Sequence, residues 1–158
     1  MSDGFNLANL KREILSRSES DIWDAAKLEW GLASVFDADE PQRCLCDHYP
    51  IIEVCVIRNR KNGVVAEVGN VCVTKFLGIN ADKIFGAIKR VKSDIDRALN
   101  PEAIELFYEL KVLNDWERGY YLDTWRKNAG LSVNQLATRQ KINRKVLANM
   151  ARAEAALR

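Results

Sequence analysis

Apolar and polar residues alternate along most of this chain with the period of an α-helix. Between positions 6 and 17 the apolar residues form one stripe, and the same spacing continues from Asp21 toward Phe36. The acidic run from Asp37 to Glu40, closed by Pro41, is typical of a loop. The apolar residues of the two stripes are Leu7, Leu10 and Ile14, followed by Ile22, Ala26, Trp30 and Ala33. Two N-terminal helices are therefore expected before residue 41.

The period changes after Pro50. Residues 51–58 and 64–68 are rich in β-branched side chains, and Asn62-Gly63 stands between them. An Asn-Gly pair between two such runs is a strong hairpin signal, because both positions of the tight turn need positive φ. In the predicted register the pairs are Lys61 with Val64, Ile57 with Val68, Cys55 with Asn70 and Glu53 with Cys72.

Helical periodicity resumes beyond the hairpin. A helix is expected around Cys72 to Leu77, and residues that favour the first positions of helices then recur to the end of the chain. The expected starts are Asn80, Asn100 with Pro101, Asn114, Ser132 with Gln135 in a capping box, and Asn143. The pattern favours three segments: N-terminal helices (1–40), the hairpin and the helices after it (41–99), and a C-terminal helical region (100–158) that forms one compact unit with 1–99.

Composition is that of a globular protein. Of the 158 residues, 47% are apolar and 29% are charged, and no apolar run is long enough to cross a membrane. The first residues lack the basic and apolar pattern of a secretory leader, so a cytoplasmic location is expected. Thiols stay reduced there, and the four cysteines therefore favour a metal site or small buried side chains over disulfides.

The segment Cys44-Leu-Cys46-Asp-His48 is the strongest candidate for a site. Zinc binds four soft or borderline ligands in a tetrahedron, commonly two from a tight knuckle and two from a distant segment. The hairpin brings Cys72 back beside this knuckle, and His48, the single histidine, follows it directly. We expect a structural Zn²⁺ held by Cys44, Cys46, His48 and Cys72, with Cys55 as the alternative to His48. The competing interpretation, that the cysteines are buried hydrophobes, suits Cys55 best.

This region resembles a zinc-knuckle pattern found in uncharacterised proteins of phages, prophages and bacteria. The matching residues are Cys44-Leu-Cys46-Asp-His48-Tyr-Pro-Ile, Ile57-Arg58-Asn59 with Gly63, and Val68-Gly69-Asn70 before Cys72-Val73 and Phe76. Parts of the segments 116–121, 131–135 and 142–145 resemble the C-terminal region that accompanies the pattern. The chain departs from it at Asp47, where glycine is usual. The resemblance implies metal binding and a mobile-element context, without an established activity.

Together these features predict a mostly helical α+β fold. Its centre is expected to be a small metal-stabilised β-hairpin, of zinc-knuckle or treble-clef-like type, surrounded by helices.

Charge is distributed unevenly. From Arg126 onward eight basic side chains face one acidic side chain, a net charge of +7, whereas the rest of the chain carries −5. The tail is also similar to a helix-turn-helix, whose second helix would begin at Asn143. Lys141 and Gln140 depart from that motif, since glycine and an apolar residue are usual there. The residues predicted to contact nucleic acid are Arg139, Lys141, Asn143, Arg144, Lys145 and Asn149. The alternative is a plain helical hairpin whose basic residues face water.

No catalytic motif is recognised in the sequence. There is no glycine-rich phosphate loop, no Gly-x-Ser-x-Gly elbow and no His-Glu-x-x-His. The large aromatic residues at helical spacing are expected in the core; they are Trp23, Trp30, Trp116, Tyr120 and Trp125. A non-enzymatic protein is predicted, with a metal-dependent nuclease as a distant alternative.

The function expected from the sequence is that of a metal-stabilised accessory or regulatory protein, related to phages or mobile elements. It would contact nucleic acid through its basic C-terminal tail. The alternative is a protein-binding modulator or inhibitor of a host or phage machine, which binds a protein partner and no nucleic acid.

Overall fold

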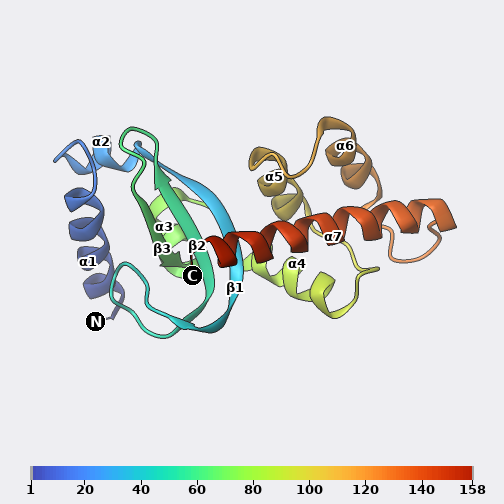
Figure 1. Ribbon diagram of the computed structural model, residues 1–158, viewed down its shortest axis with the longest axis horizontal. Coiled ribbons are helices and arrows are strands. Elements are labelled where there is room, and N and C mark those ends of the chain that lie inside the picture. Colours follow the sequence, from blue (N-terminus) through green and yellow to red (C-terminus); the bar gives the residue numbers. More distant parts are fainter. Residues whose placement is uncertain (1, 158) are drawn as a thin grey trace. The chain divides into compact units, whose positions relative to one another are not determined.

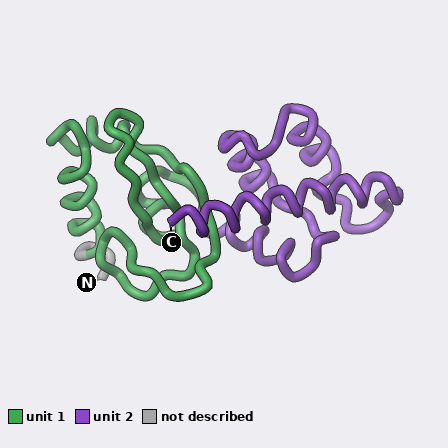
Figure 2. Tube along the Cα trace, in the orientation of Figure 1, with its two compact units in different colours: residues 1–79 green, residues 80–158 purple. Residues whose placement is uncertain are grey.

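The chain forms two compact units in the computed structural model, which describes the backbone of residues 2–157 and the side chains of residues 6–157. Unit 1 spans Met1–Ile79 and unit 2 spans Asn80–Arg158 (Figure 2). The boundary between these units lies between Ile79 and Asn80, whereas the segments predicted from the sequence ended at residues 40 and 99.

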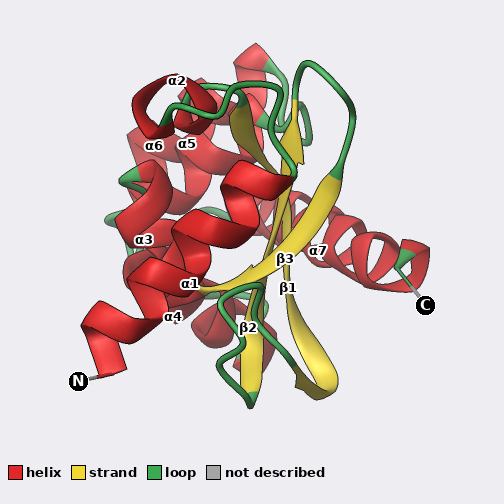
Figure 3. Ribbon diagram, turned by 90° about the vertical axis from the view of Figure 1, so that its left-hand side faces the viewer, coloured by secondary structure: helices red, strands yellow, loops and turns green. Residues whose placement is uncertain are grey.

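Unit 1 combines three helices with a three-stranded antiparallel sheet in the order β1-β2-β3 (Figures 1 and 3). Its elements are α1 (Ser2–Ser16), α2 (Trp23–Lys27), β1 (Trp30–Gln42), β2 (Ile51–Asn59), β3 (Val65–Gly69) and α3 (Asn70–Leu77). Helix α3 packs on β2 and β3, and Trp23 of α2 contacts Phe76 of α3 with ring centroids 5.7 Å apart. The three helices and the sheet thus share one core.

The second predicted helix is wrong over most of its length, because residues 30–42 form strand β1. The helix that was expected to reach Phe36 ends at Lys27, and the acidic run before Pro41 belongs to the strand. Val35 and Phe36 point to opposite faces of the sheet, pair with β2 and are both buried. Pairing with β2 therefore overrides a helical spacing that Gly31 already weakens. Because β1 is an edge strand, Pro41 removes no interstrand hydrogen bond that the sheet requires.

The hairpin exists, but its turn is longer than predicted. Asn59 donates its backbone N–H to the carbonyl of Val64 (2.9 Å), and the four residues Arg60 to Gly63 lie between this bonded pair. Only Gly63 of the turn pair has positive φ (+77°). The buried Asn59 side chain accepts the amides of Lys61 and Asn62, which stabilises the wider turn.

The wider turn shifts the register by two residues. Cys55 pairs with Val68 and not with Asn70. A shift of two keeps each side chain on its expected face. The strand nevertheless ends at Gly69, so Cys72 lies in helix α3 and not opposite Glu53.

Among its described residues, unit 2 contains helices and connecting loops but no strand. Its helices are α4 (Ala81–Ser93), α5 (Pro101–Glu109), α6 (Asp115–Thr124) and α7 (Val133–Ala156). The predicted caps Asn80, Asn100, Asn114 and Ser132 each accept a backbone N–H at the start of the helix that follows. The predicted start at Asn143 is wrong, because α7 continues through it without a break.

These elements confirm the predicted fold class, a mostly helical α+β protein with a small antiparallel sheet. Among the described residues, no helix is both long enough and apolar enough to cross a membrane.

Candidate metal centre and the basic helix

Residues 44–48 form a tight knuckle between β1 and β2. The amide of Cys44 donates to the carbonyl of His48 (2.9 Å), and the amide of Asp47 donates to the carbonyl of Cys44 (2.8 Å). Asp47 takes the left-handed conformation with φ +79°. Aspartate is among the few residues other than glycine that tolerate positive φ, so this position suits the turn.

The knuckle is attached to the rest of unit 1 from two sides. The amide of Leu45 donates to the carbonyl of Glu67 (2.9 Å), on the edge of β3 that does not face β2. From α1, the side chain of Asn9 donates to the carbonyl of Cys46 (3.1 Å) in a buried position. These bonds place the two knuckle cysteines beside the end of β3 and the start of α3.

Three buried cysteines converge at this place. The sulfurs of Cys44, Cys46 and Cys72 all lie within 4.8 Å of one another, and the residues are 3%, 1% and 7% exposed. The sulfurs of a tetrahedral zinc site, with Zn–S bonds of about 2.3 Å, lie about 3.8 Å apart. The cluster therefore has the size and the donor type to bind a metal ion.

Backbone amides point at the sulfurs of the knuckle. Gly69 donates its N–H to Cys44 Sγ (3.3 Å), and the amide of Cys46 hydrogen-bonds the same sulfur. The amide of His48 hydrogen-bonds the sulfur of Cys46. Such donors stabilise the thiolate form of cysteine, which is the form that binds metals.

The acidity of the cluster also depends on how its sulfurs affect one another. The Cys72 thiol hydrogen-bonds Cys44 and, with the amides, lowers the pKa of Cys44 to about 6. The same hydrogen bond raises the pKa of Cys72, and burial raises the pKa of Cys46. Cys44 therefore loses its proton readily. Cys46 and Cys72 keep theirs, because a second thiolate would be repelled by the first. A bound cation would remove that repulsion.

The two candidates for the fourth ligand lie outside this cluster. Cys55 is 1% exposed on β2, and burial raises the pKa of its thiol to about 12. It behaves as a small buried hydrophobe, and it pairs with Val68 of β3 whereas Cys72 lies in α3. His48 is an exposed residue of the knuckle, two residues after Cys46.

Helix α7 does not present all the residues predicted to contact nucleic acid. Arg139 and Asn143 are 1% and 0% exposed, so assigning them to an interface was wrong. The structure leaves Lys141, Arg144 and Lys145 on the surface, with Asn149 half-buried.

Arg139 and Asn143 instead bind main-chain carbonyls within unit 2. Arg139 donates to the carbonyls of Thr124 (2.6 Å) and Lys127 (3.0 Å), and more weakly to that of Asp96 (3.3 Å). Asn143 donates to the carbonyls of Ile95 (2.8 Å) and Arg97 (2.9 Å). The sequence contained a signal for this burial. Arg139 and Asn143 lie at helical spacing on the same stripe as Ile142, Val146 and Met150, which is the buried face of α7.

The aromatic residues divide between core and surface. Trp30 is buried, as predicted, with its indole N–H donating to Ser18 Oγ (2.8 Å). Trp116 contradicts the prediction, because it is 63% exposed and stacks on Tyr120 with ring centroids 5.1 Å apart. Trp23 and Trp125 are half-buried.

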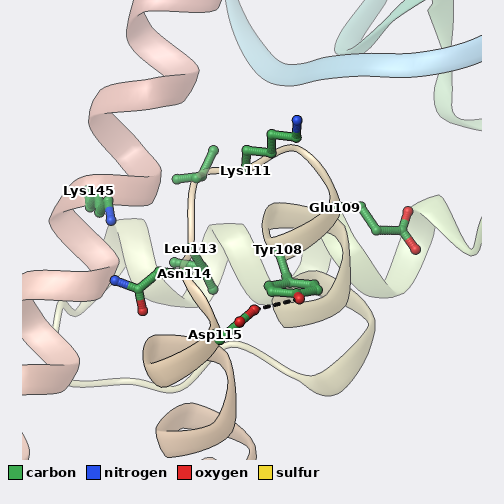
Figure 4. Close-up of a pocket in the computed structure, with 8 residues that line it drawn as sticks. Tyr108, Glu109, Lys111, Leu113, Asn114, Asp115 and Lys145 are labelled. Carbon is green, nitrogen blue, oxygen red and sulfur yellow. Dashed lines mark hydrogen bonds between the residues drawn. The ribbon is translucent and has the colours of Figure 1, made fainter.

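A pocket of about 550 Å³ lies in unit 2 beside the segment that joins α5 to α6. Lys145 from α7 and Asn114 point toward one another at one side, and Tyr108 donates to Asp115 (2.6 Å) at the other (Figure 4). Its lining is Tyr108, Glu109, Lys111, Val112, Leu113, Asn114, Asp115 and Lys145.

Comparison of the chain with protein-family models, with curated proteins and with solved structures finds no match.

Proposed function

We propose that Cys44, Cys46 and Cys72 hold a structural zinc ion, with His48 as the fourth ligand, in an accessory protein without catalytic activity. The observation that supports this most strongly is the convergence of three buried sulfurs from two segments. Zinc favours such a thiolate-rich set with one imidazole. His48, the single histidine of the chain, stands two residues after Cys46 and is exposed.

The ion would connect parts of unit 1 that regular structure holds weakly. The knuckle is an irregular loop, and β3 is a strand of five residues at the edge of a small sheet. A metal bound to Cys44, Cys46 and the first turn of α3 joins the loop to the helix. In such a site the binding free energy contributes to folding.

Metal analysis of the purified protein tests this proposal. We expect one zinc per chain, lost in Cys72→Ser and retained in Cys55→Ala, which removes a buried thiol outside the cluster. Substitution by Co²⁺ should give the visible absorption of a tetrahedral thiolate site. In His48→Ala the Co²⁺ spectrum should change, with weaker metal binding. A folded wild-type protein without stoichiometric metal, or a Cys72→Ser variant that keeps it, would overturn the proposal.

We further propose that the accessory role involves nucleic acid, contacted by the exposed cations of α7. Unit 2 has 15 basic and 10 acidic residues, a net charge of +5, whereas unit 1 carries −3. Lys141 and Arg144 are exposed on α7, and Lys145 is accessible although it pairs with Glu117 (2.8 Å). Exposed lysine and arginine side chains on a helix neutralise phosphates.

Salt-dependent binding tests this second part. We expect the full chain to retain DNA or RNA at low salt and to lose it steeply as salt rises. The double variant Lys141→Glu, Arg144→Glu should abolish retention. A matched double variant on α4, Lys89→Glu with Lys92→Glu, should reduce it much less. Equal losses in the two variants would indicate attraction to net charge and would contradict a role for α7. The phage context and the absence of catalysis stay predictions.

A further inference from the structure

The surface of α6 carries an aromatic pair that the metal centre does not use. Trp116 is 63% exposed, and its ring lies on that of Tyr120 at a centroid distance of 5.1 Å and an interplanar angle of 17°. Most of the Trp116 side chain is therefore accessible to a ligand.

The pair is held rigidly. Tyr120 donates its hydroxyl to the carbonyl of Gln135 (3.0 Å), which fixes the ring against α7. Trp116 lies in the first turn of α6, where Asn114 and Glu117 form a capping box. The two rings, called the aromatic platform below, are therefore ordered before any ligand arrives, which lowers the entropic cost of binding.

Cations of α7 lie against α6, the helix that carries the aromatic platform. Glu117, the neighbour of Trp116, is paired with Lys145 at 2.8 Å. Burial alone would raise the pKa of Glu117, but Lys145 and the Asn114 amide, together with the charge of Lys141, hold it below its ordinary value. Lys145 therefore contacts α6 directly, and Lys141 lies near enough for its charge to act on Glu117. Lys145 and Lys111 both line the pocket described above (Figure 4).

This combination favours one kind of ligand. Bases of a single strand stack on aromatic rings while lysines contact its phosphates, whereas a duplex hides the faces of its bases. Tryptophan and tyrosine also occur at protein interfaces, but lysine is depleted there. The positive charge of unit 2 likewise favours a polyanion.

We infer that the chain binds single-stranded nucleic acid, with a base stacked on Trp116 and the backbone held by Lys141, Lys145 and Lys111. This inference rests on the proposed nucleic-acid contact and names its ligand class and a residue that recognises it.

Binding of a fluorescent oligothymidylate of 12 nucleotides, compared with a duplex of equal length, tests the inference with the full chain. We expect the single strand to bind more tightly. Trp116→Ala should weaken single-strand binding by about tenfold or more, and Trp116→Phe should restore most of it. Trp125→Phe is the matched control and should leave affinity unchanged. Circular dichroism of each variant should equal that of the wild type.

The possible outcomes separate the two proposals. If the duplex binds as well as the single strand and Trp116→Ala has no effect, the stacking inference is overturned while nucleic-acid contact by α7 stands. If neither oligonucleotide binds at low salt, both proposals fail. A protein ligand that depends on Trp116, without oligonucleotide binding, would also overturn the inference and would favour the protein-modulator alternative.

Discussion

The two units use different chemistry to fix segments that lie outside regular structure. In unit 1 three sulfurs of the irregular knuckle and α3 converge, and we propose that a zinc ion joins them. In unit 2 the loops before α5 and after α6 are held by Arg139 and Asn143 of α7, which donate to five backbone carbonyls. The stability of unit 1 should therefore depend on an ion, whereas that of unit 2 should depend only on its own side chains.

Removal of the proposed metal should produce the largest difference in stability between the two units. A strong chelator, or Cys72→Ser, should destabilise unit 1 by at least about 5 kcal/mol, since structural zinc contributes roughly 10–16 kcal/mol in fully metal-dependent peptides. Hydrogen exchange should increase in peptides from residues 30–77 and stay slow in peptides from residues 100–156. Equal changes in both sets of peptides would contradict the comparison.

Loss of the buried Arg139 side chain should destabilise unit 2 and leave unit 1 unaffected. Arg139→Leu leaves three carbonyls without their charged donor and should destabilise unit 2 by about 3 kcal/mol. Thermal unfolding and hydrogen exchange measure this effect. The metal content should stay at the wild-type value, because the cysteine cluster lies in unit 1. Lys141→Leu, an exposed position two residues away, is the control and should change stability little.

Acid should reveal a further contribution within unit 1. The side chain of Asn59 and the amides of Glu19 and Ser20 donate to Glu29, and the pKa of Glu29 is lowered chiefly by the Asn59 bond. A lowered folded-state pKa means that this stabilisation is complete above the ordinary glutamate pKa of about 4.3 and is lost as pH falls through the folded value.

The stability difference between wild type and Glu29→Gln should accordingly be largest near pH 7 and shrink toward pH 3 in denaturant titrations. Both proteins carry the same cysteines, so any effect of acid on the metal cancels in the difference. A difference that does not vary with pH would contradict the assigned role of the Glu29 carboxylate.

The smallest expected effect concerns the knuckle turn. Asp47→Gly relieves a left-handed conformation that costs a non-glycine residue about 1 kcal/mol. We expect a slight stabilisation of the metal-loaded protein and unchanged metal content. Asp47→Val should do the reverse, because a β-branched residue tolerates positive φ poorly. If both variants weaken metal binding equally, the Asp47 side chain, which also pairs with Arg43, matters more than its backbone.

Local signals in the sequence were reliable where short-range chemistry decides the structure. The caps Asn100, Asn114 and Ser132 start helices because a side chain and an amide three residues later suffice for that bond. The same signals failed for β1, since a strand forms only when a partner strand is present. They also failed for the helix-turn-helix, because the burial of Asn143 depends on loops far away in the chain.

The candidate site shows the same division. The sequence by itself determined the fold class, the positions of most helix starts and the three cysteines that meet, because periodicity, capping and the Asn62-Gly63 hairpin signal are local properties. Only the tertiary structure decided that Cys55 lies apart from the cluster, that Arg139 faces inward and that Trp116 faces outward. Burial and register are sums over contacts between distant segments, and no single stretch of sequence contains them.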